Sequence, residues 1–320
     1  MAQRSDSSPA TDWRSQPERG NSLALHIIRW IATRIGRPPA RLLLYPITLY
    51  FFLSAGHARR MSRRFLQRAG VPGVHSGHVL RHLHTFAAVI LDRVYFLRGE
   101  MERFDIQLHL APGTREHLAA ERGALMLGAH VGSFDALRAL GLQNRRAKLK
   151  VLMHHDHNQL ITQFLEALNP GFAETVIPLG RPDTLLRTKE WVDEGGCVAL
   201  LGDRVFEAGD DVRGRSLTCD FLGHPAQLPT GPIRLAGTLR TPVMLFFAIY
   251  RGGNRYDVYL EWLTDAGEVT AHRDPEVLQR LVQRYAARLE AYSIDAPYNW
   301  FNFYDFWQSA ETADRDVQDG

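Results

Sequence analysis

Short apolar runs of strand length alternate along this chain with segments whose apolar residues recur at helical spacing. The strand candidates are residues 124–127, 149–153, 174–177, 197–201, 242–250 and 255–262. The helix candidates are residues 79–97, 114–120 and 275–292. Such alternation predicts an α/β fold in which helices flank a central sheet. Because residues 251–254 join the last two strands as a hairpin, we expect a mixed sheet and not a purely parallel one.

The strand candidate at residues 124–127 runs directly into a turn that contains His130, Gly132, Ser133 and Asp135. On one continuous helix, residues five apart point about 140° away from each other, so His130 and Asp135 converge only if His130 precedes the helix. Gly132 permits this break, and Ser133 suits the N-cap. A carboxylate at one ring nitrogen leaves the other free to accept a proton near neutral pH. We therefore predict that His130 is a general base held by Asp135, although such a pair also arises by chance.

The N-terminal fifth of the chain is basic and contains two apolar stretches. Residues 1–70 hold 12 Lys/Arg and 3 Asp/Glu, whereas residues 71–320 hold 26 and 32. The apolar stretches are residues 23–35 and 42–55, and the fourteen residues of the second would span only about 21 Å as a helix, short of the roughly 30 Å hydrocarbon core. Residues 21–70 therefore fit an interfacial or re-entrant helical region at an anionic membrane surface. A buried core helix with solvated flanks explains the same pattern.

The remaining chain divides by composition. Residues 71–310 are expected to form the α/β domain, and the polar ends at residues 1–20 and 311–320 are expected to be disordered. Cys197 and Cys219 lack metal-ligand spacing and are expected to be reduced, packed thiols, which favours a cytoplasmic setting.

Four blocks of the sequence resemble one family. The pattern His130-x-x-x-x-Asp135 behind a small apolar strand is similar to the first block of the lysophospholipid acyltransferase superfamily, in particular the bacterial lipid A late acyltransferases. Residues 187–204, which end in Asp203-Arg204, resemble the second block, a helix and then a strand closed by an acidic motif. Residues 221–236 resemble the third block, and the aromatic residues of 297–307 resemble the C-terminal signature.

This resemblance implies a glycerolipid acyltransferase-like sheet and a membrane-associated acyltransferase. Such an enzyme moves a fatty acyl chain from acyl carrier protein or coenzyme A to a hydroxyl or amine of a lipid acceptor, here of a lipid A-like kind, by His/Asp general-base catalysis. The implied location is the cytoplasmic face of the bacterial inner membrane. The implied reaction uses no cofactor or metal beyond the acyl thioester, and nucleic acid is not among the implied partners.

Four further residues are candidates for substrate binding: Asn158, Asp203, Arg204 and Arg215. By the resemblance, Asn158 closes a polar motif that lies near the acceptor site. An Arg guanidinium forms two parallel hydrogen bonds to a phosphate, which suits Arg204 and Arg215 to a lipid headgroup or to the phosphopantetheine of an acyl carrier. An internal Asp203–Arg204 pair that tethers the following loop is the alternative.

Two other classes of function stay open. The cluster His154-His155-Asp156-His157 leaves room for a metal-dependent hydrolase, although adjacent residues of an extended segment face opposite sides and the spacing matches no established zinc motif. A non-catalytic lipid-binding accessory protein would also carry this fold.

Overall fold

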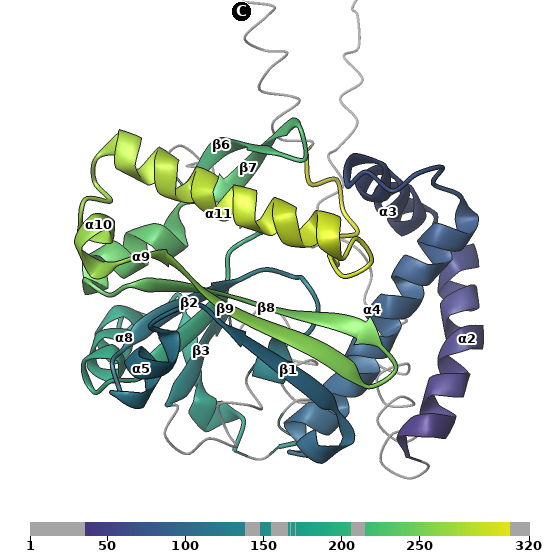
Figure 1. Ribbon diagram of the computed structural model, residues 1–320, viewed down its shortest axis with the longest axis horizontal. Helices are drawn as coiled ribbons and strands as arrows, with labels where there is room; N and C mark the ends of the chain where they lie inside the picture. Colours follow the sequence, from purple (N-terminus) through teal and green to yellow (C-terminus); the bar gives the residue numbers. More distant parts are fainter. Residues whose placement is uncertain are drawn as a thin grey trace, which may run out of the picture.

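A seven-stranded mixed sheet forms the centre of the part of the protein that the structure describes (Figure 1). The structure is a computed structural model, and it describes residues 36–137, 148–154, 166, 168–169, 171–205 and 215–307. The strands of the sheet are β1 (Asp105–Leu110), β2 (Ala124–Gly128), β3 (Leu149–His154), β4 (Val176–Leu179), β5 (Cys197–Leu201), β8 (Val243–Gly252) and β9 (Arg255–Thr264). Their spatial order is β1-β9-β8-β2-β5-β3-β4.

The direction of the strands confirms the mixed sheet. Strands β8, β2, β5, β3 and β4 pair parallel to their neighbours, β9 pairs antiparallel to β8, and β1 pairs parallel to β9. All six predicted strands are present, with ends shifted by a few residues. The sequence does not predict β1, because this edge strand is largely exposed and lacks a continuous apolar run.

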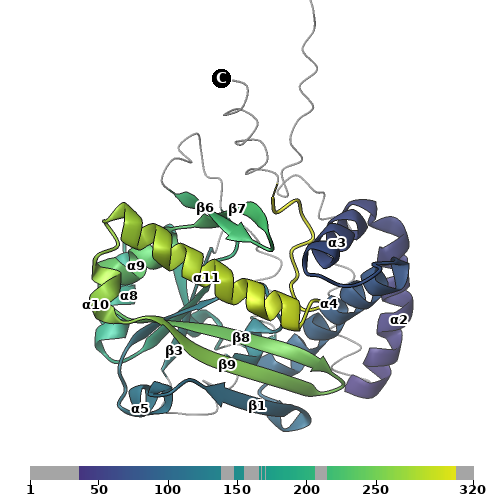
Figure 2. The same cartoon turned by 45° about the horizontal axis from the view of Figure 1, so that its top comes forward.

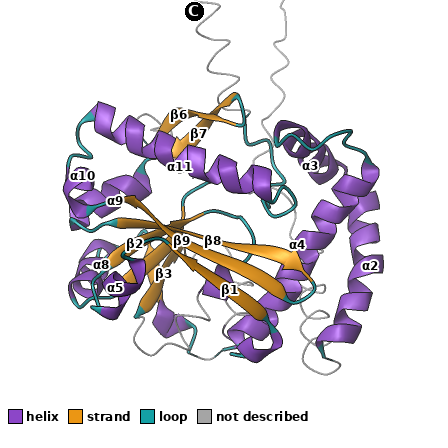
Figure 3. Ribbon diagram, in the orientation of Figure 1, coloured by secondary structure: helices purple, strands orange, loops and turns teal. Residues whose placement is uncertain are grey.

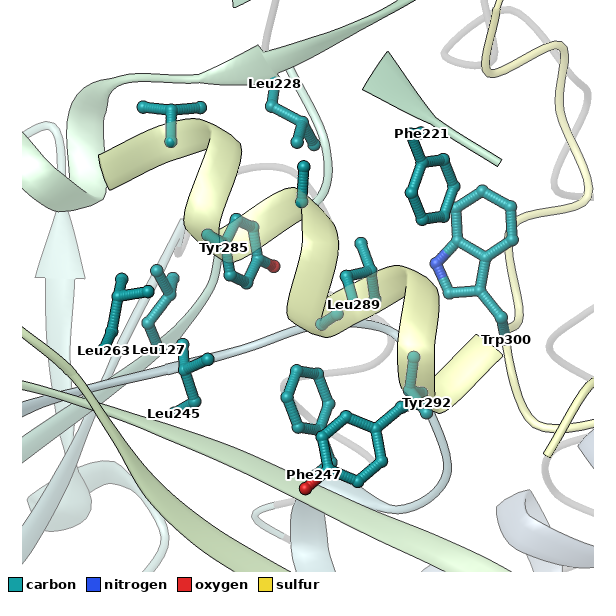
Figure 4. Close-up of a cluster of buried hydrophobic side chains, with 14 of the residues drawn as sticks. Leu127, Phe221, Leu228, Leu245, Phe247, Leu263, Tyr285, Leu289, Tyr292 and Trp300 are labelled. Atoms are coloured by element: carbon teal, nitrogen blue, oxygen red, sulfur yellow. The ribbon is translucent and has the colours of Figure 1, made fainter. Parts of the chain in front are cut away.

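The long helix α11 (Pro275–Asp295) covers one face of the sheet and closes the main hydrophobic core (Figure 4). Its buried Tyr285 and Leu289 face Leu127, Leu245 and Phe247 of the sheet. A separate antiparallel hairpin, β6 (Ser216–Phe221) and β7 (His224–Pro229), contacts α11 from above in Figure 2. Helices α9 (Gly231–Leu239) and α10 (Ala266–Thr270) complete this layer.

Helix α4 (Ser76–Leu97) packs against the opposite face of the sheet, and α2 (Arg37–Ser54) packs on α4 (Figure 3). A second hydrophobic cluster fills the space between α4 and strands β2, β8 and β9. Helix α3 (Gly56–Arg68) follows α2 and also contacts α4.

Helix α5 (Thr114–Ala119) lies against β9, and α8 (Thr184–Asp193) lies against β4 and β5. Two single 3₁₀ turns occupy Met101–Arg103 and Ala173–Thr175.

The basic, apolar N-terminal region forms two helices where the structure describes it. Arg37 of α2 donates hydrogen bonds of 2.7 and 2.8 Å to the two carboxylate oxygens of the buried Asp92 on α4, and Tyr256 donates a third at 2.9 Å. These bonds fasten α2 to the domain. Within the described ranges, none of the helices combines the length and apolar character that a membrane span requires. Residues 23–35 and both predicted tails lie outside the described residues, so contact of this region with a membrane stays a prediction.

Candidate functional site

The loop after β2 holds His130 in a fixed position. Gly132 has φ = 62°, and a Cβ atom there would lie 1.8 Å from the carbonyl oxygen of Ala248, so only glycine fits this turn. The backbone N–H of Gly132 donates to the carbonyl of Asn299 at 2.8 Å. The backbone N–H of Phe301 donates to the carbonyl of His130 at 2.7 Å. The C-terminal residues 299–302 thus brace the loop like a short added strand.

Asp203, which comes two residues after β5, lies directly against His130. Its Oδ1 is 2.7 Å from His130 Nδ1, and its Oδ2 accepts a bond of 3.0 Å from the His130 backbone N–H. Strands β2 and β5 are parallel neighbours with Gly128 opposite Leu201, so the loops that follow them emerge at the same edge of the sheet. Because an ionised carboxylate can only accept a hydrogen bond, the proton of the neutral ring sits on Nδ1 and Nε2 carries a lone pair.

The free nitrogen of His130 is available for chemistry. The His130 side chain is 28% exposed, and Nε2 makes no hydrogen bond to any residue that the structure describes. Packing around the ring lowers the pKa of His130, the charge of Asp203 partly opposes this, and Arg204 and Arg93 lower the pKa further. The imidazole is therefore neutral near pH 7, as a general base must be.

Four hydrogen-bond donors from three residues surround the carboxylate of Asp203, which is fully buried. Burial by itself would raise the pKa of Asp203, but the charge and hydrogen bonds of His130, together with the charge of Arg204, hold that pKa well below its usual range. Its Oδ2 also accepts bonds from Asn302 Nδ2 at 2.8 Å and from Trp300 Nε1 at 3.2 Å. A carboxylate so supported fixes the orientation of the imidazole and stabilises its protonated form.

The position of Asp135 differs from the predicted one. Asp135 is buried in the first turn after the loop, and its Oδ2 lies 2.7 Å from Nε of Arg93 on α4. Its Oδ1 has no hydrogen-bond partner among the described residues. The hydrogen bond to His130 that the spacing assigned to Asp135 is made by Asp203, because the loop turns the Asp135 side chain toward α4. The same geometry takes Asp203 out of the expected set of substrate contacts.

Arg204 is tied to the C-terminal segment. Its Nε donates to Asn302 Oδ1 at 2.8 Å and its Nη2 to the carbonyl of Phe301 at 3.2 Å. The sequence left open that Arg204 has a tethering role through a pair with Asp203. In the structure Arg204 is tied instead to Phe301 and Asn302 of the C-terminal segment. Arg215 directly precedes β6, and its carbonyl accepts bonds from Thr230. Asn158 and the cluster residues His155 to His157 lie outside the described residues, and no group of three metal-binding side chains gathers within the described ones.

Sequence reasoning missed the two supporting residues Trp300 and Asn302. In the sequence, the aromatic run at residues 297–307 showed only a resemblance to the family's C-terminal signature. In the structure this run is an irregular loop with turns, and the Trp300 ring is completely buried beside Phe221 and near the end of α11 (Figure 4). The polar residues Asn299 and Asn302 inside an aromatic run were the available signal, because buried amides require partners.

A partly exposed imidazole with a buried carboxylate behind it, at the carboxyl edge of a mostly parallel sheet, is an arrangement that suits the class of α/β enzymes in which histidine acts as a base. Within this class, the model of the bacterial lipid A biosynthesis acyltransferase family matches residues 103–309. The chain belongs to this family, which confirms the expected family and the acyltransferase class.

A curated relative agrees with this assignment. The chain is 28% identical over 183 residues to the phosphatidylinositol mannoside acyltransferase of Mycolicibacterium smegmatis, and the match covers 56% of each protein. The chain thus spans about half the length of the curated relative that it matches.

Proposed function

We propose that this protein transfers a fatty acyl chain from an acyl thioester to a hydroxyl or amine of a lipid, with His130 as the general base. The observation that carries the proposal is the 2.7 Å contact between His130 Nδ1 and Asp203, which leaves Nε2 free at a partly exposed ring. Membership of the lipid A acyltransferase family supplies the reaction class. The proposed role of Asp135 changes with the geometry, from imidazole partner to partner of Arg93.

The proposed reaction needs only His130 and Asp203 from the protein. His130 Nε2 removes the proton of the acceptor hydroxyl, and the oxygen attacks the thioester carbonyl carbon. The tetrahedral intermediate collapses, the carbon–sulfur bond breaks, and the leaving thiolate takes the proton back from the imidazolium. Asp203 stabilises that imidazolium throughout. Ser133 is buried and its Oγ lies 3.3 Å from the backbone N of Ala136, which disfavours a serine nucleophile.

The family and the relative support an inference about the substrates. We infer acyl carrier protein or coenzyme A as the donor, because both present the acyl chain as a phosphopantetheine thioester. The description of the family names lipid A biosynthesis, and the name of the relative contains phosphatidylinositol mannoside. We therefore infer a lipid acceptor that carries a free hydroxyl or amine. Asn158 and Arg215 remain proposed substrate contacts. The reaction as written uses no cofactor or metal.

One face of α2 supports the proposed association with the cytoplasmic face of the inner membrane. Leu42, Tyr45, Leu49 and Leu53 share one side of this helix and are each at least half exposed. The opposite side of α2 buries Ala40, Leu44 and Thr48 against the domain. An exposed apolar helix face with exposed arginines on the following helix suits a peripheral, interfacial contact with anionic lipid.

The direct test replaces His130 with alanine and measures transfer of a labelled palmitoyl chain from palmitoyl-CoA to a total membrane lipid extract. We expect the rate to fall by about 10²–10⁴-fold while the fold, followed by circular dichroism, is unchanged. The matched control is His109→Ala, since His109 is an exposed histidine on the edge strand β1. A wild-type rate in His130→Ala would refute the proposed function.

A further inference from the structure

Two neighbouring charged residues of α4 form ion pairs in different surroundings. Asp92 is buried and binds Arg37 of α2 and Tyr256 of β9. Arg93, the next residue, reaches Asp135 in that loop, and the distance from its Nε to Asp135 Oδ2 is 2.7 Å. Asp135 lies five residues after His130, so this second ion pair belongs to the same loop as the base.

The guanidinium of Arg93 has donors to spare. Its side chain is 26% exposed, and neither Nη atom donates a hydrogen bond to a residue in the described ranges. The charge of Arg93 acts on His130, since it is one of the charges that lower the pKa of that ring. Arg204, the other cation that acts on His130, already donates from Nε and Nη2 to Asn302 and Phe301.

Stability alone gives a poor reason for this ion pair. Asp135 is almost fully buried, and its Oδ1 accepts no hydrogen bond from the described residues. Desolvating such a carboxylate costs free energy that one contact with Arg93 does not fully recover, and apolar residues in place of a buried pair are often as stable. The contact with Asp135, however, leaves the two Nη groups of Arg93 without a hydrogen bond to any described residue. That planar pair of donors matches two oxygens of a phosphate.

We propose that Arg93, positioned by Asp135, binds a phosphate group of one of the two substrates beside His130. The inference rests on the proposed function and deepens it, because both inferred substrates carry phosphate. The donor has the phosphodiester of its phosphopantetheine arm, and a lipid acceptor can carry a phosphate in its headgroup. Arg93 contacts substrate in this arrangement, whereas Asp135 acts through Arg93.

The experiment compares two palmitoyl donors in Arg93→Gln. Palmitoyl-CoA contains phosphate, and the palmitoyl thioester of N-acetylcysteamine does not. If Arg93 binds the donor phosphate, the KM for palmitoyl-CoA rises about ten-fold or more and the KM for the phosphate-free thioester is unchanged. If it binds the acceptor phosphate, the KM for the total membrane lipid extract rises with either donor. Arg93→Lys keeps the charge but loses the planar donors, and we expect an intermediate KM.

The matched control is Arg37→Gln, which breaks the neighbouring ion pair of α4. It should lower the unfolding temperature without raising either KM. A second readout is the acid limb of kcat/KM, which should move to higher pH in Arg93→Gln, because removal of a nearby positive charge makes His130 easier to protonate. In Arg37→Gln the acid limb should stay in place.

The inference is overturned if Arg93→Gln raises neither KM more than Arg37→Gln does. That result would leave the proposed function intact as long as His130→Ala abolishes transfer. Transfer that survives His130→Ala would instead remove the proposed function, whatever Arg93 does. A stable fold in Arg93→Lys keeps the comparison valid if the Gln variant unfolds.

Discussion

At the scale of single residues, two carboxylates of the site contact different side chains. Asp203 touches the imidazole of His130, and Asp135 touches the guanidinium of Arg93. Both carboxylates are buried, yet only Asp203 is surrounded by hydrogen-bond donors, which include Trp300 and Asn302. The acid that orients the base is therefore Asp203.

Asp203→Asn should lower kcat/KM by about 10²-fold or more, because the amide can no longer stabilise the imidazolium. The charge of Asp203 raises the pKa of His130, so its loss should also move the acid limb of kcat/KM to lower pH. Asp135→Asn should leave that limb in place and act mainly on KM. A pH–rate profile of the two variants decides between the carboxylates, and a larger loss with a limb shift in Asp135→Asn would contradict this assignment.

The sequence pointed to His130 but not to its hydrogen-bond partner, for a reason of geometry. The partner was sought five residues away along the chain, whereas the register of β2 against β5 brings in Asp203 from 73 residues away. No local pattern encodes which strands become neighbours. The Trp300 and Asn302 contacts come from still further along the chain. The sequence therefore predicted His130 and its loop, and it named Asp203 and Arg204 as site residues without the contacts that they make.

At the scale of elements, buried strands and amphipathic helices were predictable, and exposed ones were not. Strands β2, β5 and β8 are buried apolar runs, whereas β1 and the β6–β7 hairpin are partly exposed and carry polar residues. Helix α2 has both a buried side and an exposed side. Its apolar stretch was visible, but which side packs on α4 and which faces outward depends on the tertiary contacts of the helix.

The outward side of α2 should govern membrane binding. Replacing Leu42, Leu49 and Leu53 with glutamate should weaken flotation with anionic vesicles by about ten-fold or more, because apolar contact is lost and negative charge is added. Circular dichroism should be unchanged, since these residues are exposed. The control replaces Leu185 and Leu186, two exposed leucines of α8, with glutamate in the same way. Equal loss of flotation in both variants would contradict a specific role of α2.

His82 of α4 connects three elements and should make their stability depend on pH. Its Nδ1 lies 2.9 Å from Ser62 Oγ of α3, and its Nε2 lies 2.9 Å from the carbonyl of Trp300. Burial lowers the pKa of His82 to about 4. The unfolded chain, with a pKa of about 6.5, binds the proton first as pH falls, so stability is lost below about pH 6.5.

This group alone should make the protein less stable by about 2 kcal/mol at about pH 5 than at about pH 7.5. Urea unfolding at the two pH values measures the difference. His82→Gln should lower stability at the higher pH, and the dependence on pH should shrink by about the same 2 kcal/mol. An unchanged pH dependence in this variant would show that His82 is not the titrating group.

At the scale of the whole molecule, the α/β class and the family followed from patterns spread along the chain. A mixed sheet with α4 on one face and α11 on the other places the ends of β2 and β5 at one edge, where the C-terminal segment closes over them. Segments far apart in the chain, namely the loops after β2 and β5 and residues 299–302, thus fix the position of one imidazole. In contrast, the residues that build this scaffold show no pattern that identifies the proposed acceptor lipid.

The most direct test of this account is mass spectrometry of the lipids from cells that lack the gene and from cells complemented with either the wild type or His130→Ala. A lipid lighter by one acyl chain should accumulate without the gene, persist with His130→Ala and disappear with the wild type. Restoration of the fully acylated lipid by His130→Ala, at equal protein abundance, would contradict the claim that this histidine performs acyl transfer.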